Sequence, residues 1–105
     1  MVKSNTTLID LIRKRACHYL DETKRNERVL EKMLEVDRAD FLPENVRQYA
    51  YLDKPVAIGY NQTCSQPSMV AFILDKLNIQ PGNKILEIGS GCGYAAAIAS
   101  KLCGT

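Results

Sequence analysis

A glycine-rich stretch, Gly-Ser-Gly-Cys-Gly at residues 89–93, is the part of the sequence best suited to binding a charged ligand. It follows a short apolar run at residues 84–88, of the kind that lies inside a parallel sheet, and precedes an alanine-rich run at residues 94–102 that favours helix. A glycine turn between a strand and a helix lets the backbone approach a ligand, and the amino end of the helix attracts a negative group. The stretch therefore predicts a cofactor-binding turn.

Two cofactor classes compete for this turn. Residues 91–96 satisfy the G-x-G-x-x-A form of the dinucleotide fingerprint, which would indicate an NAD-binding oxidoreductase. That fingerprint should begin where the strand ends, but Gly89 and Ser90 intervene, and counting from Gly89 places the bulky Tyr94 at the sixth position. Residues 86–93 instead resemble the first motif of S-adenosylmethionine-dependent methyltransferases.

The methyltransferase interpretation gives the residues of this motif distinct tasks. The glycines would let the chain curl against the methionine end of S-adenosyl-L-methionine, and a carboxylate would hold the cofactor's ammonium group by a charge-assisted hydrogen bond. The predicted cofactor-binding residues of the motif are Glu87, Gly89, Ser90, Gly91, Cys92 and Gly93. The alternative is a plain tight turn, although such a turn needs one glycine and three of them cost chain entropy.

More of the chain resembles one family of these enzymes, the protein-L-isoaspartate O-methyltransferases. The likeness runs through residues 26–43, 50–59 and 62–70 to the glycine motif, and so covers nearly the whole chain. Many methyltransferases share the glycine motif, whereas the Gln-Thr-x-Ser-x-Pro turn at residues 62–67, preceded by Asp-x-Pro and Ile-Gly, is specific to this family. The resemblance implies protein repair, in which a methyl group passes from S-adenosylmethionine to the free carboxylate of L-isoaspartyl residues in damaged proteins and peptides.

The resemblance also assigns roles within the specific turn. Ser65 corresponds to the active-site residue, placed to hydrogen-bond near the reacting carboxylate, while Gln62, Thr63 and Cys64 border the cofactor and the substrate. Ser65 has a purely structural alternative, because a serine just before Gln-Pro and a helix is typical of an N-cap. Cys64 is expected to be a small buried apolar residue rather than a nucleophile, since no paired histidine is evident.

The chain departs from the family pattern at two positions and in length. Asn61 stands where glycine is usual, and asparagine tolerates the left-handed conformation well. Ser68 replaces a larger side chain and is expected to change the pocket edge. A full family member continues for as many residues again, so we expect a truncated chain that binds cofactor weakly or not at all when tested alone and that self-associates. The remaining alternative is a non-catalytic assembly module.

The elements that must position these residues can be predicted from apolar spacing. One amphipathic helix is expected over residues 6–20, with Thr7 and Asp10 as its capping box, and a second after Asn26 as far as about Val36. A short helical turn at residues 44–49, a polar loop at 60–67, a helix ending at Asn78 and a strand at 84–88 follow. The expected fold is α/β: residues 1–58 form an N-terminal helical region, and residues 59–105 begin a Rossmann-like methyltransferase domain.

Composition narrows the remaining function classes. The 105 residues carry 14 Lys and Arg against 12 Asp and Glu, and these charges are interleaved, so no nucleic-acid partner is expected. No apolar run is long enough to span a bilayer, and the first residues lack a secretory signal, which predicts a cytoplasmic protein. The four cysteines show no C-x-x-C spacing and His18 is the only histidine, so we expect reduced thiols, no metal site and no disulfide framework.

Overall fold

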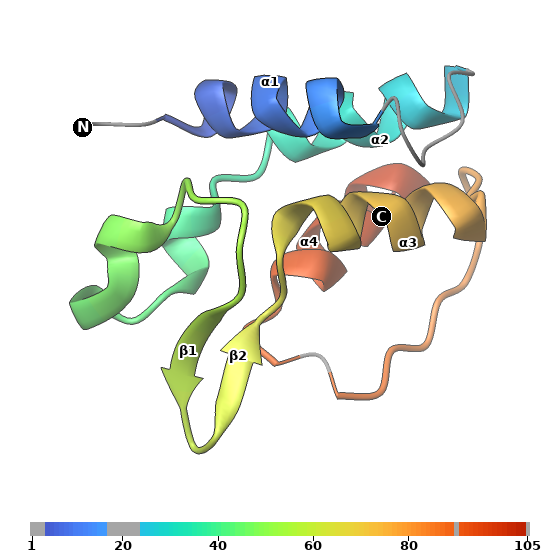
Figure 1. Ribbon diagram of the computed structural model, residues 1–105. Helices are drawn as coiled ribbons and strands as arrows, with labels where there is room; N and C mark the ends of the chain where they lie inside the picture. The colour runs from blue at the N-terminus through green and yellow to red at the C-terminus, as the bar shows by residue number, and fades with distance from the viewer. Residues whose placement is uncertain (1–3, 17–23, 90, 105) are drawn as a thin grey trace.

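The computed structural model describes residues 4–16, 24–89 and 91–104 and consists of helices with one small hairpin (Figure 1). Its elements in chain order are α1 (Asn5–Ala16), α2 (Lys24–Leu34), the 3-10 helices η1 (Arg38–Phe41) and η2 (Glu44–Tyr49), β1 (Val56–Gly59), β2 (Gln62–Cys64), α3 (Pro67–Leu77) and α4 (Tyr94–Cys103). No helix among the described residues has the length and apolar character needed to cross a membrane.

The helices α1 and α2 confirm the two predicted amphipathic segments but begin at different residues. The Ser4 hydroxyl accepts a hydrogen bond from the Thr7 amide at 3.1 Å, so the predicted capping box of Thr7 and Asp10 is wrong. Asn26 is not an N-cap either, because α2 already begins at Lys24. The predicted end of the first helix, beyond Ala16, lies outside the described residues.

The polar loop predicted at residues 60–67 contains a strand. Strands β1 and β2 pair antiparallel with Val56 opposite Cys64 and Ala57 opposite Thr63. The hairpin turns through Tyr60 and Asn61, whose φ angles of 55° and 59° are both left-handed. Such a pair of angles matches the twist of a two-residue hairpin, and it confirms that Asn61 serves where the family usually has glycine.

Helix α3 begins and ends with identifiable signals. The Asp53 carboxylate accepts a hydrogen bond from the Ser68 amide at 2.8 Å, which caps the amino end of the helix from 15 residues away. The helix ends at Asn78, as predicted, and this residue closes it in the left-handed conformation with a φ of 50°. Ser68 itself is buried within the first turn, and the effect of its small side chain on the pocket edge stays a prediction.

The hydrophobic core runs through both halves of the chain. Helix α2 packs on α1, α3 and α4, and α1 also packs on α3, so that α3 and α4 lie against the layer of α1 and α2 (Figure 1). The core includes residues from all four helices and from the hairpin, among them Leu8, Ile12, Leu30, Met33, Val56, Cys64, Val70, Leu74, Tyr94, Ile98 and Leu102. Cys64 belongs to this core and Cys92 packs against it, so the core holds the two loops that carry these residues next to each other.

The strand predicted at residues 84–88 is wrong for the described structure. The segment runs without any strand pairing, and the sheet of the described residues consists of β1 and β2 alone. Leu86 and Ile88 are 87% and 89% exposed. A parallel strand exists only beside neighbours that accept and donate its backbone hydrogen bonds, and no described segment occupies that place.

Candidate functional site

The glycine loop, defined as residues 89–93, lies against the family-specific turn, defined as residues 62–65. A Cβ built on Gly91 would come within 3.8 Å of the Thr63 carbonyl oxygen, and the Cys92 thiol donates to the Cys64 sulfur at 3.0 Å. Between them lies a cavity of about 80 Å³, lined by Thr63, Cys64, Ser65, Val70, Glu87, Gly89, Gly91, Cys92, Tyr94 and Ala95. The fold thus brings together most of the site residues predicted from the two motifs.

Two predicted residues, Gln62 and Gly93, do not line this cavity. Gln62 is exposed at the start of β2, and Gly93 occupies the N-cap position of α4. Ser90 lies outside the described residues.

The glycines of the loop are needed for its backbone. Gly89, Gly91 and Gly93 have φ angles of 73°, 58° and 89°, a region that other residues adopt at a cost of about 1–2 kcal/mol each. An ordinary tight turn requires one such position, whereas this loop uses three in alternation. The result is a backbone that curls in front of the amino end of α4, where the helix dipole favours a negative group.

Ser65 does not cap the helix that follows it. The N-cap position of α3 is Gln66, which makes no capping hydrogen bond through its side chain, and the cap is supplied by Asp53 instead. The capping interpretation of Ser65 is therefore wrong. Its side chain is exposed and lines the cavity, and its carbonyl oxygen accepts a hydrogen bond from Arg38.

Arg38 is the residue that sequence reasoning missed. It is 0% exposed, and its guanidinium donates to the carbonyl oxygens of Ala50, Leu52, Lys54, Cys64 and Ser65 at 2.9–3.3 Å. The guanidinium carbon also lies 5.9 Å from the centre of the Tyr94 ring at the start of α4. One side chain thus ties the family-specific turn to the preceding loop and to the helix behind the glycine loop.

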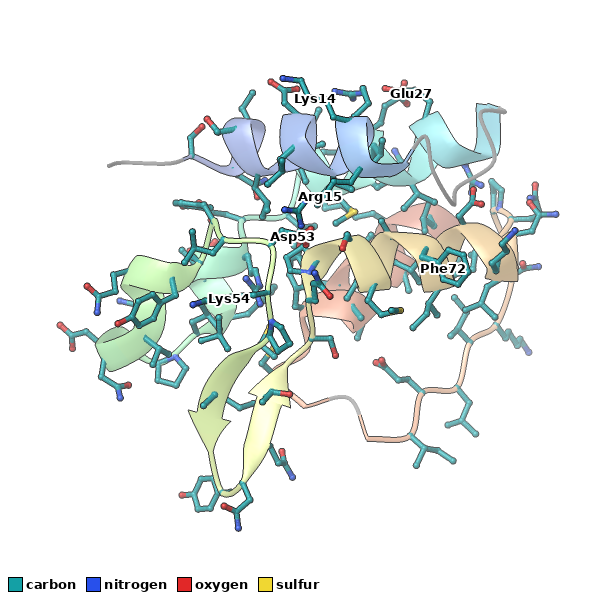
Figure 2. All side chains as sticks on the ribbon, viewed as in Figure 1. Lys14, Arg15, Glu27, Asp53, Lys54 and Phe72 are labelled. Atoms are coloured by element: carbon teal, nitrogen blue, oxygen red, sulfur yellow. The ribbon has the colours of Figure 1, made fainter. Side chains whose placement is uncertain are left out.

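Asp53 explains why the Asp-x-Pro sequence accompanies the family-specific turn. Its carboxylate is 2% exposed and binds the Ser68 amide through one oxygen and Arg15 through the other, at 2.8 Å (Figure 2). Gln66 donates to the Asp53 carbonyl at 3.0 Å. These bonds hold the start of α3, and with it the turn, against α1.

Cys64 is buried, as predicted, and is a poor nucleophile. Burial, with the hydrogen bond from Cys92 as the next cause, raises the pKa of the Cys64 thiol to about 11, although the nearby Arg38 guanidinium opposes the shift. The thiolate is therefore scarce at neutral pH.

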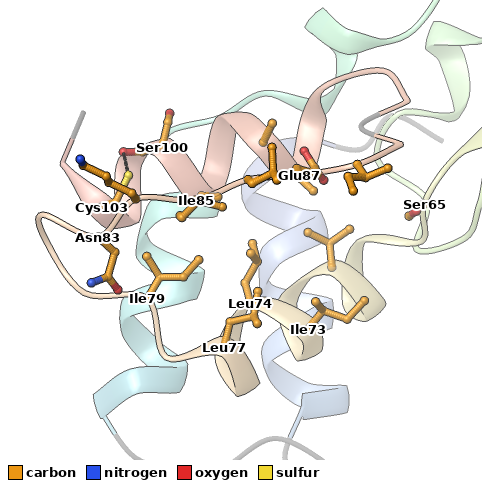
Figure 3. Close-up of a pocket in the computed structure, with 17 residues that line it drawn as sticks. Ser65, Ile73, Leu74, Leu77, Ile79, Asn83, Ile85, Glu87, Ser100 and Cys103 are labelled. Atoms are coloured by element: carbon orange, nitrogen blue, oxygen red, sulfur yellow. Dashed lines mark hydrogen bonds between the residues drawn. The ribbon is translucent and has the colours of Figure 1, made fainter.

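A second, larger hollow of about 700 Å³ separates the extended segment at residues 83–88 from α3 and α4 (Figure 3). Its walls are mainly apolar and include Ile73, Leu74, Leu77, Ile79 and Ile85. Ser65 and Glu87 line both this hollow and the small cavity. The shape follows from the missing strand, since the apolar segment is not held against the helices by sheet neighbours.

Comparison with known proteins decides the family. The family model described as "Protein-L-isoaspartate(D-aspartate) O-methyltransferase (PCMT)" matches residues 5–105. The chain belongs to this family. Among curated family members, the protein-L-isoaspartate O-methyltransferase of Methanothrix thermoacetophila is 49% identical over 88 residues, which cover 81% of this chain and 42% of that protein. The Methanocella arvoryzae protein of the same name is 55% identical over 69 residues, covering 66% of this chain and 37% of that protein.

Solved structures of the protein-L-isoaspartate O-methyltransferase family share the fold. A Plasmodium falciparum protein assigned to this family, crystallised in complex with S-adenosyl-L-homocysteine, has a TM-score of 0.81 and 28% identity, covering 98% of this chain and 44% of that one. A second protein-L-isoaspartate O-methyltransferase has a TM-score of 0.73 and 27% identity, covering 95% and 31%. The chain therefore spans less than half the length of the relatives it matches.

Proposed function

We propose that this family member, at the length of its relatives, transfers a methyl group from S-adenosylmethionine to the free carboxylate of L-isoaspartyl residues in damaged proteins. The observation that carries the proposal is the contact between the family-specific turn and the glycine loop around one cavity. A substrate-side turn and a cofactor-side loop have to meet if a methyl group is to pass between their ligands.

The residues of the small cavity fit the methionine end of the cofactor. We assign to that end Glu87, Gly89, Ser90, Gly91, Cys92 and Gly93, with Gln62, Thr63 and Cys64 along the border to the substrate. The loop backbone would accommodate the carboxylate before α4, and Glu87 would accept a hydrogen bond from the ammonium group. A volume of about 80 Å³ suits only this end, because sites for whole drug-sized ligands occupy about 300–1,000 Å³.

The bound cofactor supplies an electrophilic methyl group on a sulfonium. The protein has little acid–base work to do, since the isoaspartyl carboxylate is already an anionic nucleophile. The task of the turn is to align that carboxylate and to keep water out. We assign Ser65 as the active-site residue, its hydroxyl donating a hydrogen bond near the reacting carboxylate from a backbone that Arg38 holds in place.

Methyl-ester formation on paired peptides tests the proposal. The protein at the length of its relatives, called the full-length protein below, should methylate an L-isoaspartyl peptide and leave the matching aspartyl peptide unmodified. Titration with S-adenosylhomocysteine and with NAD, followed by calorimetry, should show affinity for the first alone. Transfer only to RNA or to a small molecule, or affinity for NAD alone, would contradict the proposal.

The exposed apolar segment at residues 84–88 supports a second copy of the chain as a further partner. We propose that the 105-residue chain self-associates through this segment when it is tested alone, because an extended, exposed apolar segment can form a strand by pairing with a second copy. The cytoplasmic location stays a prediction from the sequence.

A further inference from the structure

The two cysteines at the meeting point of the loops are close enough to react with each other. Cys64 lies at the end of β2 and Cys92 lies 28 residues later in the glycine loop, yet their sulfur atoms are 3.0 Å apart. The sequence offers no sign of this pair, since the spacing matches neither a C-x-x-C motif nor any metal site. The pairing comes only from the packing of the loop against the turn.

We propose that Cys64 and Cys92 form a site of reversible oxidation, where hydrogen peroxide converts the two thiols into a disulfide that joins the family-specific turn to the glycine loop. The proposal goes beyond methyl transfer, and its chemistry is independent of whether the substrate is an isoaspartyl peptide.

Formation of the disulfide requires only a small movement of the two sulfur atoms. A disulfide bond is about 2.05 Å long, so the sulfur atoms must approach by about 1 Å. Cys64 is held in place by its strand position opposite Val56 and by the bond from Arg38 to its carbonyl oxygen. Cys92 is flanked by Gly91 and Gly93, whose backbones have the freedom to absorb the shift. We therefore expect Cys92 and the glycine loop to move, while Cys64 and the family-specific turn keep their positions.

Exposure sets the order of the two chemical steps. Cys92 is half-buried and Cys64 is 1% exposed, so peroxide reaches the Cys92 sulfur first. The Cys92 thiol loses its proton, the thiolate attacks one peroxide oxygen and the O–O bond breaks. The products are a sulfenic acid and a hydroxide, which takes up the lost proton and leaves as water. The Cys64 thiol, held next to the Cys92 sulfur, then displaces the sulfenic hydroxyl; its proton leaves with that hydroxyl as a second water, and the S–S bond forms. This proximity compensates for the low thiolate fraction of Cys64. Two thiols and one peroxide thus give one disulfide and two waters, with two electrons passing from sulfur to oxygen.

Cys103 provides a matched control within the same chain. It is also buried, but its sulfur lies 3.4 Å from the carbonyl oxygen of Ser100 on its own helix (Figure 3). Cys103 is the last residue of α4, whereas Cys92 precedes the first. If burial and cysteine content alone decided oxidation, Cys103 would behave like Cys64.

Peptide mass spectrometry on the full-length protein tests the site. The protein is treated with a small excess of hydrogen peroxide, alkylated and digested, and the peptides containing Cys64 and Cys92 should appear joined, with two hydrogens lost and full recovery after dithiothreitol. Cys92→Ser should abolish the cross-link, whereas Cys103→Ser should leave its yield unchanged.

Several results would overturn the proposal. One is separate alkylation of Cys64 and Cys92 after treatment of the unsubstituted protein. Others are a sulfinic acid at Cys92 beside an alkylated Cys64, or a disulfide from either residue to another cysteine. These outcomes are measured on the unsubstituted protein, so they do not depend on whether a variant folds. They are measured by peptide mass and not by methyl transfer, so they are distinguishable from a failure of the proposed function.

Discussion

The family-specific turn at residues 62–65 and the extended segment at residues 84–88 border the same cavity but are held in opposite ways. The turn is fixed from behind by Arg38, which is 0% exposed and binds two of its carbonyl oxygens. The segment has the apolar residues of a buried strand, yet Leu86 and Ile88 remain almost fully exposed. Burial of an apolar run thus depends on neighbours, whereas the turn finds its hydrogen-bond partners within the described chain.

The two regions differ in the partners that their backbones need in order to be held in place. A turn can be completed by one long side chain that reaches several carbonyl groups, as Arg38 does for five of them. A parallel strand requires at least one neighbouring strand and helices over both faces of the sheet.

Removing Arg38 should have the largest effect on folding. Arg38→Met keeps most of the side-chain volume but leaves five carbonyl oxygens without their donor, three of them in the loop before β1 and two in the turn. We expect the free energy of unfolding of the full-length protein to fall by about 3–5 kcal/mol, measured by urea denaturation.

Arg47→Met is the matched control. Arg47 also donates to two carbonyl oxygens, those of Ala39 and Leu42, but from an exposed position where water can replace it. Its loss should cost less than about 1 kcal/mol. Equal costs for the two variants would show that the buried network does not hold the turn.

The 105-residue chain should bind S-adenosylhomocysteine about a thousandfold more weakly than the full-length protein. Open α/β sheets build their ligand crevice from the ends of several strands, and the small cavity serves one end of the cofactor. A thousandfold loss corresponds to about 4 kcal/mol at about 1.4 kcal/mol per tenfold. Calorimetry on both proteins measures the ratio, and micromolar binding by a monomeric chain would refute the prediction.

Light scattering on the same chain tests the other half of the comparison. The double variant Leu86→Lys, Ile88→Lys should lower the average mass of the self-associated chain towards that of a monomer, since it charges the exposed segment. Leu34→Lys is the control, because Leu34 is 42% exposed on α2 and lies outside the segment. Equal effects of both changes would place the association elsewhere.

The backbone conformations that single residues prefer could be predicted from the sequence, whereas helix caps and contacts that the tertiary fold decides could not. The left-handed angle of Asn61 and the three glycines follow from the properties of those residues. The sequence left Ser65 as either an active-site residue or the N-cap of α3, and the acceptor that caps this helix, Asp53, is brought there by the tertiary fold. Arg38 gave no signal, since arginine is rarely buried without a carboxylate and its partners here are backbone groups. The strand at residues 84–88 was predicted from its apolar residues, and these do not specify its neighbours.

The buried thiol predicts a loss of stability at alkaline pH. The Cys64 pKa is raised from 9.0 to about 11 by burial, so between these values the unfolded chain loses a proton that the folded chain keeps. The free energy of unfolding should therefore be unaffected below pH 9.0 and fall above it, by at most about 1.4 kcal/mol per pH unit.

Reduced full-length protein and Cys64→Val should be compared by urea denaturation between pH 8 and 10. The raised pKa of Tyr94, also caused mainly by burial, adds a similar decline only above its ordinary value of 10.0. Val is close to cysteine in size and cannot ionise, so the variant should lack the earlier decline. Parallel curves for the two proteins would show that Cys64 ionises equally well in both states.

Asp53 and Ser65 should separate folding from chemistry with the smallest changes in stability. Asp53→Ala removes the cap of α3 and the pair with Arg15, and we expect about 1–2 kcal/mol of destabilisation in the full-length protein.

Ser65→Ala should change stability by less than about 0.5 kcal/mol, because the exposed hydroxyl caps nothing and the bond from Arg38 goes to the backbone. Turnover of an isoaspartyl peptide should nevertheless fall with Ser65→Ala at saturating substrate. Unchanged turnover would remove the active-site role, and a cost as large as that of Asp53→Ala would restore the cap to Ser65.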